Sequence, residues 1–211
     1  MIVILDYRMG NAGSVRNMCS RLGIDAVISR EPDVVTNASH LILPGVGHFS
    51  RCIEAINALN LRPLLDHAVL TLEKPILGVC MGMQVMTIGS EEGTGAGLGW
   101  VDAHTKRLNV TPTPGGRQAK VPHMGWGYVE PMRPHPVLGE LPVESRFYFV
   151  HSYAVECANT GDVLLRSHFA GHDFASAFAT RNIVGVQFHV EKSHLFGMRL
   201  LERFARWNGR A

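Results

Sequence analysis

Strand and helix patterns alternate through the first hundred residues, and this alternation constrains the fold more than any other feature of the chain. Apolar runs typical of buried strands lie at 2–5, 26–28, 41–43 and 75–79. Helical spacing of apolar residues lies between them, at 11–22, 49–59 and 63–72. Strands that alternate with helices form a parallel sheet covered on both faces. We therefore predict an α/β fold with an open, mostly parallel sheet flanked by helices.

The second half of the chain has a different pattern. Residues 101–180 hold mostly short strands separated by turns, so we predict additional antiparallel strands there. Four glycines in 93–99 predict a loop, and the sequence of 111–116 predicts a turn or an exposed hairpin tip.

The chain closes with a predicted strand at 183–189 and a predicted helix from about Ser193 to Trp207. No internal repeat and no interdomain linker is visible in the sequence. A length of 211 residues allows one domain or at most two small ones. We expect a single domain over 1–211.

Composition excludes several classes of protein. Lys and Arg number 20 against 18 Asp and Glu, which argues against a strongly basic nucleic-acid binder and an acidic tail protein. The four cysteines lie far apart without a Cys-x-x-Cys pair, so we expect no disulfide framework, no Cys-rich zinc site and a reducing compartment. The first apolar run lacks the basic flank of a signal peptide, and no run is long enough for a membrane helix. We expect a cytoplasmic, soluble protein.

A cysteine stands where a strand is predicted to turn into a helix. Gly78 and Gly82 flank Cys80 in the pattern Gly-x-Cys-x-Gly, and small residues at these positions let a sharp turn form without clashes. The N-terminus of the following helix favours a thiolate, the reactive form of cysteine. The backbone N–H of Met81 would point into the same space and hold an oxyanion. Burial as a small apolar residue is the more common fate of a cysteine, and we assign it to the other three.

A cysteine nucleophile needs a base, and the base needs an acceptor that orients it. His189 and Glu191 follow the last predicted strand, and side chains two apart on a strand share a face. The C-terminal edge of an open α/β sheet is also where Cys80 is expected. Eleven histidines weaken an argument from any single one, and we assign His104, His135 and His172 to structural or surface positions. A zinc site is the rival use of histidine, and we expect no metal.

The sequence GVCMGMQ around Cys80, together with QFHVEKS at 187–193, resembles the class I glutamine amidotransferases, which use a catalytic triad. Three further motifs are narrower: PGVG at 44–47, PHMGW at 122–126 and YFVHSY at 148–153. They are similar to the glutaminase subunit of imidazole glycerol phosphate synthase, the HisH family. The similarity runs in order over nearly the whole chain and implies the flavodoxin-like fold of that class.

The resemblance implies a reaction and the residues that perform it. Cys80 attacks the side-chain amide of glutamine, His189 passes a proton to the leaving ammonia, and Glu191 orients His189. The peptide around Val46 and Gly47 supplies the second oxyanion donor, in a loop that relatives hold unproductive until the partner binds its substrate. Residues implied to serve the bound glutamine are Gln84 and Ser152, which would contact it, and Gly45, which would give it room. No cofactor is implied.

The resemblance also implies a partner. Relatives dock on a (β/α)8 synthase subunit that makes imidazole glycerol phosphate and AICAR from PRFAR in histidine biosynthesis, and the ammonia passes through its barrel. Residues that match the docking face are Asn11, Trp126, Tyr148 and Lys192. An exposed tryptophan is a plausible interface anchor, whereas core packing is the alternative interpretation of Trp126.

The chain departs from the family at three positions. Val190 stands where proline is usual, Gly127 where asparagine is common, and His48 where a small residue is common. Valine is β-branched and still favours extended backbone, so we predict that the triad survives. The Gly127 position lies near the docking face, so contacts with the partner could differ.

Other functions stay open from the sequence. Ser193-His194 and Phe196-Gly197 resemble a sister branch that supplies ammonia for the amination of a bacterial surface sugar. A non-catalytic subunit that only activates its partner is a third hypothesis, disfavoured because Cys80, His189 and Glu191 are all present. The glutaminase partner of pyridoxal phosphate synthase is a weaker rival, since its loops differ from PGVG and PHMGW.

Overall fold

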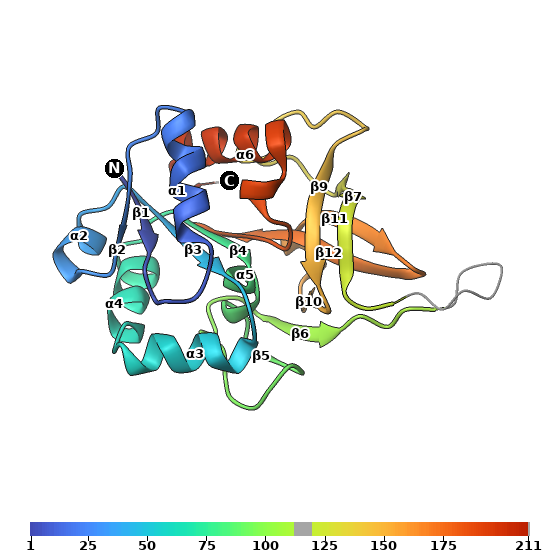
Figure 1. Ribbon diagram of the computed structural model, residues 1–211, viewed down its shortest axis with the longest axis horizontal. Coiled ribbons are helices and arrows are strands. Elements are labelled where there is room, and N and C mark those ends of the chain that lie inside the picture. Colours follow the sequence, from blue (N-terminus) through green and yellow to red (C-terminus); the bar gives the residue numbers. More distant parts are fainter. Residues whose placement is uncertain (112–119, 211) are drawn as a thin grey trace.

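The computed structural model of the protein describes residues 1–111 and 120–210 and confirms an α/β fold with helices on both faces of a sheet (Figure 1). The predicted turn at 111–116 falls almost wholly outside the described residues. Within those two ranges, no helix has the length and apolar character needed to cross a bilayer.

Parallel strands form the centre of the main sheet. In spatial order they are β2 (Ala26–Ser29), β1 (Ile2–Leu5), β3 (His40–Gly45), β4 (Ile76–Cys80) and β13 (Ile183–Val186). Each pair of neighbours among them is parallel. The strands β1, β4 and β13 are buried along their whole length, because helices cover both faces and every side chain faces a core.

Two cores lie on the two faces of the sheet, and helices cover each face (Figure 1). The helices on one face are α1 (Ala12–Arg21) and α6 (His194–Arg206). The helices on the other are α2 (Pro32–Thr36), α3 (Phe49–Ala58), α4 (Arg62–Asp66) and α5 (Met81–Val85). The predicted helix at 63–72 is divided into α4 and a π-helical turn over His67–Thr71. The sequence pattern missed α2, which is only five residues long.

Antiparallel strands extend the sheet beyond β13, as predicted. They are β12 (His172–Thr180), β10 (Tyr153–Cys157), β6 (Ala103–Arg107), β11 (Val163–Phe169) and β8 (Glu130–Pro131), with the short β5 (Gly89–Ser90) parallel to β6 at the edge. A separate antiparallel pair consists of β7 (His123–Tyr128) and β9 (Arg146–His151). A 3-10 turn at Thr160–Asp162 leads into β11.

The last strand is shorter than the sequence predicts. β13 ends at Val186, and a 3-10 turn follows at Val190–Lys192. The reason is a change of partner: the backbone N–H of Gln187 still donates to Ser176 of β12, whereas that of His189 donates to Tyr148 of β9, 2.9 Å away. The chain thus leaves the main sheet at the carboxyl end of β13 and joins the small sheet.

Candidate active site

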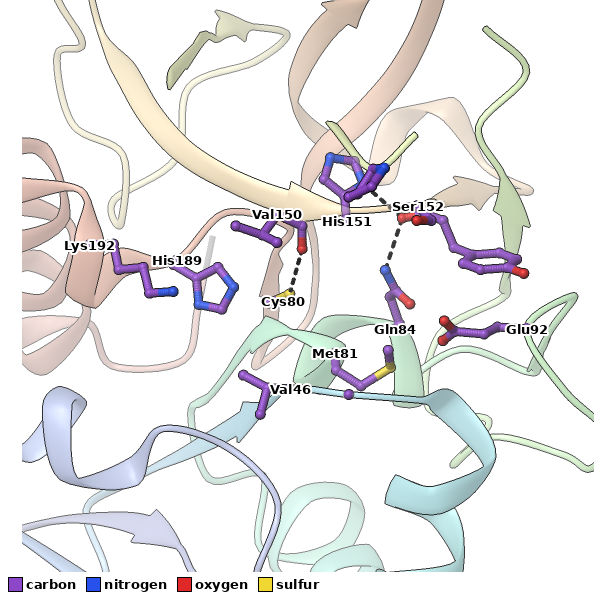
Figure 2. Close-up of a pocket in the computed structure, with 13 residues that line it drawn as sticks. Val46, Cys80, Met81, Gln84, Glu92, Val150, His151, Ser152, His189 and Lys192 are labelled. Carbon is purple, nitrogen blue, oxygen red and sulfur yellow. Dashed lines mark hydrogen bonds between the residues drawn. The ribbon is translucent and has the colours of Figure 1, made fainter. Parts of the chain in front are cut away.

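A cavity of about 380 Å³ opens beyond the carboxyl ends of β3 and β4 (Figure 2). This is the edge at which open α/β sheets place their ligands. The predicted residues that line it are Val46, Gly47, Cys80, Met81, Gln84, Ser152, His189 and Lys192. Segments from both halves of the chain therefore share one wall.

Cys80 occupies a strained turn between β4 and α5. Its φ of 54° and ψ of −110° lie outside the regions that L-residues favour, and such strain persists only where the surroundings enforce it. The thiol is 6% exposed and faces the cavity. The predicted elbow is confirmed as a backbone geometry.

Three glycines make room for this turn. A Cβ on Gly82 would lie 1.8 Å from the carbonyl oxygen of Leu43, and one on Gly78 would lie 2.8 Å from the oxygen of Gly82. A Cβ on Gly45 would lie 2.4 Å from the nitrogen of Gly82. Gly45 is not among the residues that line the cavity, and its expected role of giving the ligand room stays a prediction. The structure shows that Gly45 lets β3 approach the elbow.

His189 and Glu191 form a buried pair. The Nδ1 atom of His189 lies 2.8 Å from Oε1 of Glu191, and the two side chains are 4% and 2% exposed. They do not share the face of a strand, contrary to the prediction: the 3-10 turn after His189 folds the carboxylate back onto the imidazole. The hydroxyl of Ser193 donates to the backbone oxygen of His189 at 2.6 Å and accepts from the N–H of Tyr148 at 3.0 Å. The turn is thereby tied to β9.

The surroundings of His189 favour its charged form. Burial by itself lowers the pKa of His189, but hydrogen bonds to Cys80 and Glu191 outweigh burial and raise it to about 9. His151 lines the same cavity, and its pKa is shifted in the opposite direction. Burial lowers the pKa of His151 to about 3, because its partners are the neutral carbonyl of Tyr153 and the neutral ring of His123.

Gln84, which is expected to contact the substrate, has one polar side-chain atom without a hydrogen-bond partner among the described residues. The amide nitrogen of Gln84 donates to the oxygen of Tyr153 at 3.0 Å (Figure 2) and to Oε1 of Gln187 at 2.9 Å. Its own Oε1 is buried without a hydrogen-bond partner among the described residues. An orphaned buried acceptor in a cavity wall is suited to a ligand that brings an N–H donor.

Of the expected docking residues, Lys192 lines the cavity, and Tyr148 and Trp126 lie next to Lys192. Trp126 is 45% exposed, which corrects the alternative of core packing, and its ring lies 6.0 Å from that of Tyr148. The ammonium of Lys192 lies 5.7 Å from the centre of the Tyr148 ring. Asn11 lies at the start of α1, directly after Gly10, and a Cβ on Gly10 would lie 3.0 Å from the carbonyl of Pro44 in the PGVG loop.

One residue of the cavity wall and one that contacts Cys80 were missed as functional candidates. Glu92 lines the cavity, and its Oε2 accepts from the N–H of Phe49 at the start of α3, 3.0 Å away. Gln187 donates from Nε2 to the sulfur of Cys80 at 3.8 Å. Gln187 stands inside the quoted QFHVEKS motif, so the signal was there, whereas nothing in the sequence distinguishes Glu92 from its neighbour Glu91.

The departure at Val190 does not disturb the pair of His189 and Glu191. Val190 is the first residue of the 3-10 turn and is fully buried, and His189 before it has the extended backbone that a residue preceding proline adopts. At Gly127 a Cβ would lie 3.0 Å from the ring of Phe149, so a larger residue would have to displace that ring. His48 caps the N-terminal end of α3 through its backbone only. Within residues 1–111 and 120–210, no three His, Cys, Asp or Glu side chains are grouped to hold a metal.

Comparison with known proteins agrees with this geometry. Residues 3–206 match the family described as Glutamine amidotransferase class-I. The chain is 43% identical to imidazole glycerol phosphate synthase subunit HisH 2 of Methanococcus maripaludis and 42% identical to HisH 2 of Pseudomonas aeruginosa, each over 97% of this chain and 98% of the relative. HisH 1 of the same Pseudomonas is 37% identical, over 99% and 98%. A crystal structure of a glutamine amidotransferase from Thermotoga maritima superposes with a TM-score of 0.63 at 16% identity, covering 97% of this chain and 82% of that one.

Proposed function

The chain belongs to the class I glutamine amidotransferases, and within them to the HisH subunits of imidazole glycerol phosphate synthase, and from this premise we propose that Cys80, His189 and Glu191 are its catalytic triad. The protein is a glutamine amidotransferase subunit that hydrolyses glutamine for histidine biosynthesis. The observation that carries the proposal is that Cys80 lines the same cavity as a histidine whose Nδ1 lies 2.8 Å from Oε1 of the buried Glu191.

The reaction follows from the charges at the site. At neutral pH a protonated His189 beside Cys80 favours negative charge on the sulfur. The sulfur attacks the side-chain amide carbon of glutamine, and His189 gives its proton to the leaving nitrogen, so that ammonia departs and a thioester forms. Water then attacks the thioester with His189 as base, which releases glutamate and restores the thiolate.

The negative charge of the tetrahedral intermediate needs hydrogen-bond donors on the cavity wall. The N–H of Met81 at the start of α5 is the first proposed donor, and the peptide around Val46 and Gly47 supplies the second. Gly47 has a φ of 100°, and Val46 is 40% exposed. Since few contacts hold this peptide from outside, it is suited to a change of orientation when the partner docks.

The polar ends of the cavity match the two ends of glutamine. The buried Oε1 of Gln84 and the carboxylate of Glu92 are acceptors suited to the α-ammonium group, and Ser152 contributes to the same wall. We place Gln84 and Ser152 in contact with the substrate, as the resemblance implies, and add Glu92.

Substitution of the nucleophile tests the proposal. Cys80→Ala is expected to lower glutamate release by roughly 10³-fold or more, and to abolish labelling by a thiol-directed glutamine analogue. Cys157→Ala is the matched control, since Cys157 lies on β10 away from the cavity. Glutamine hydrolysis that is unchanged in Cys80→Ala would contradict the proposal and favour a subunit that only activates its partner.

An exposed apolar face next to the cavity supports docking on a (β/α)8 synthase subunit. Alternation along β7 places Met124, Trp126 and Tyr128 on one exposed side of the small sheet, at 63%, 45% and 64% exposure. Leu195 at the start of α6 is 65% exposed. Lys192 lines the cavity and contacts Tyr148, so this face borders the point at which ammonia would leave. Free thiols throughout suit the reducing cytoplasm, where we place the complex.

One observation keeps surface-sugar amination as a second candidate. Pseudomonas aeruginosa has two HisH chains, and the present chain is 42% identical to one and 37% to the other. The residues that resemble the sister branch also lie near the docking face: the ring of His194 lies 5.4 Å from that of Trp126. Co-purification with the barrel subunits of the same organism, followed by product assay, separates the two. Formation of imidazole glycerol phosphate supports the histidine pathway, and an aminated sugar with no imidazole product contradicts it.

A further inference from the structure

A second amide connects the nucleophile to the substrate wall. Gln187 follows β13 and is fully buried. Its Nε2 donates to the sulfur of Cys80 at 3.8 Å, and its Oε1 accepts from Nε2 of Gln84 at 2.9 Å. The backbone N–H of Gln187 donates to Ser176 of β12, which fixes where the side chain begins.

The hydrogen bonds determine which way each amide faces. The nitrogen of Gln84 is directed at two acceptors, the carbonyl of Tyr153 and Oε1 of Gln187, so its oxygen must face elsewhere. Because the oxygen of Gln187 accepts from Gln84, the nitrogen of Gln187 must face the sulfur. The resulting chain runs in one direction, from the unpartnered Oε1 of Gln84 to Cys80.

From this arrangement we propose that Gln187 is a further catalytic residue, which donates a hydrogen bond to the sulfur of Cys80 and links that sulfur, through Gln84, to an N–H donor bound in the cavity. The inference rests on the proposed glutaminase function. A donor on Oε1 of Gln84 polarises its amide and strengthens the bond to Gln187, and this in turn strengthens the bond to sulfur. An occupied cavity therefore has a better stabilised thiolate than an empty one.

Charged and titratable groups surround Cys80 on all sides, and the contribution of Gln187 has to be separated from theirs. Those that line the cavity with it are Glu92, His151, Tyr153, His189 and Lys192, and two more interact with it from outside the cavity: Tyr7, which follows β1, and Cys52 of α3. The amide of Gln187 is neutral at every accessible pH. Its removal should therefore shift the pH profile of Cys80 reactivity without adding or removing a titrating group.

Two substitutions at one position test the donor. Gln187→Met keeps the volume and removes the amide, whereas Gln187→Glu keeps an acceptor for Gln84 and replaces the donor that faces the sulfur. We expect alkylation of Cys80 by iodoacetamide at pH 7 to slow by about tenfold in Gln187→Met and by more in Gln187→Glu. With glutamine as substrate, kcat falls by about tenfold while KM changes less than about threefold, because Tyr153 still orients Gln84.

A matched control separates catalysis from the effect of a buried carboxylate. Asn182 lies at the other end of β13, and its amide donates to the carbonyls of Val69 and Lys74 at 2.9 and 2.8 Å. Asn182→Asp is expected to lower stability toward urea while leaving the alkylation profile and kcat of the folded protein unchanged. A kcat loss in Asn182→Asp as large as in Gln187→Glu would show that Gln187 acts only through folding.

A measurement on the wild-type protein tests the link without any variant. Glutamate offers an ammonium donor to Gln84 but has no amide for Cys80 to attack, so its binding should raise the ultraviolet absorbance of the thiolate. No rise, or Gln187 variants that alkylate and turn over at the wild-type rate, overturns the inference while the loss in Cys80→Ala still supports the proposed function. If Cys80→Ala keeps its activity, the proposed function fails, and the alkylation rates still report on the bond to sulfur.

Discussion

The two loops that meet at the cavity are both framed by glycines, yet the glycines serve different purposes. In the elbow, Gly78 and Gly82 have ordinary backbone conformations but no space for a side chain. In the PGVG loop, Gly47 has ample space, since a Cβ there would meet only the end of Met9 at 3.4 Å, but it has a φ of 100°. One loop is confined by its neighbours, and the other depends on the freedom of its own backbone.

This difference separates the fixed loop of the proposed nucleophile from the adjustable loop of the proposed oxyanion donor. The elbow is enclosed by the carbonyl of Leu43 on β3 and by its own helix, so the thiol cannot move without disrupting the sheet. The exposed Val46 has few such restraints. Gly45 belongs with the elbow although it lies in the PGVG loop, because it contacts the nitrogen of Gly82. The boundary between the rigid and the adjustable part therefore falls between Gly45 and Val46.

The largest expected effect is a loss of stability when the rigid elbow around Cys80 is disrupted. Gly82→Ala would place a methyl group 1.8 Å from a backbone oxygen that cannot yield, so we expect the free energy of unfolding to fall by about 3 kcal/mol or more. Urea unfolding followed by circular dichroism measures it. Gly13→Ala is the control, since a Cβ on Gly13 in α1 meets nothing within 4 Å and should stabilise the protein by roughly 0.5–1 kcal/mol. Equal stability of the two variants would show that the elbow is not confined.

The second expected effect follows from removing the charge of Glu191, which orients the proposed base His189. Glu191→Gln is expected to lower glutaminase activity by roughly 10²–10³-fold and to lower the pKa of His189, followed by NMR, from its value of about 9. A pKa raised above 6.5 means that charged His189 stabilises the fold fully below pH 6.5 and loses that contribution as pH rises through about 9. The variant should show a smaller alkaline loss, because one of the two partners that raise the pKa of His189 is removed. Glu202→Gln, at an exposed pair with Arg206, is the control and should change neither property.

A smaller effect tests the adjustable loop. Gly47→Ala has room for its methyl group but strains the backbone at a φ of 100°, so we expect a stability loss of only about 1–2 kcal/mol. Relief of that strain turns the peptide away from its resting orientation, which should raise resting glutaminase activity and reduce the stimulation by the barrel partner. Steady-state glutamate release with and without the partner measures both. Unchanged resting activity and stimulation would mean that this peptide does not rotate.

The smallest expected effect lies on the turn after His189. Val190→Pro fits the extended backbone of His189 and the first position of the 3-10 turn, so stability should stay within about 1 kcal/mol and activity within about twofold. Thermal unfolding and glutamate release check these values. A large rise in activity would show that the native turn impairs the pair of His189 and Glu191.

The fold could be predicted in its first half and only in outline in its second. Continuous apolar runs located β1 and β3, which are buried along almost their whole length, and helical spacing located α1 and α3, which each bury one stripe. The same spacing placed the end of the last strand at His189, three residues too late. Apolar residues continue through Phe188 for a different reason: Phe188 stacks on Phe147 of β9, with ring centres 3.8 Å apart. A hydrophobic pattern indicates that residues are buried, but it does not indicate which sheet they pack against.

The sequence by itself determined the elbow that carries the proposed nucleophile, because the spacing of Gly78, Cys80 and Gly82 is a local requirement of one turn. Only the tertiary structure decided what surrounds that thiol. Gln187 is 107 residues from Cys80 in the chain, and it reaches the sulfur because β13 lies beside β4 in the sheet. Opposite pKa shifts at His189 and His151 likewise depend on burial and on the charge of partners from other segments. The spacing of residues in the sequence sets the local geometry of a turn. The desolvation of a side chain and the charges around it depend on which distant segments pack against it.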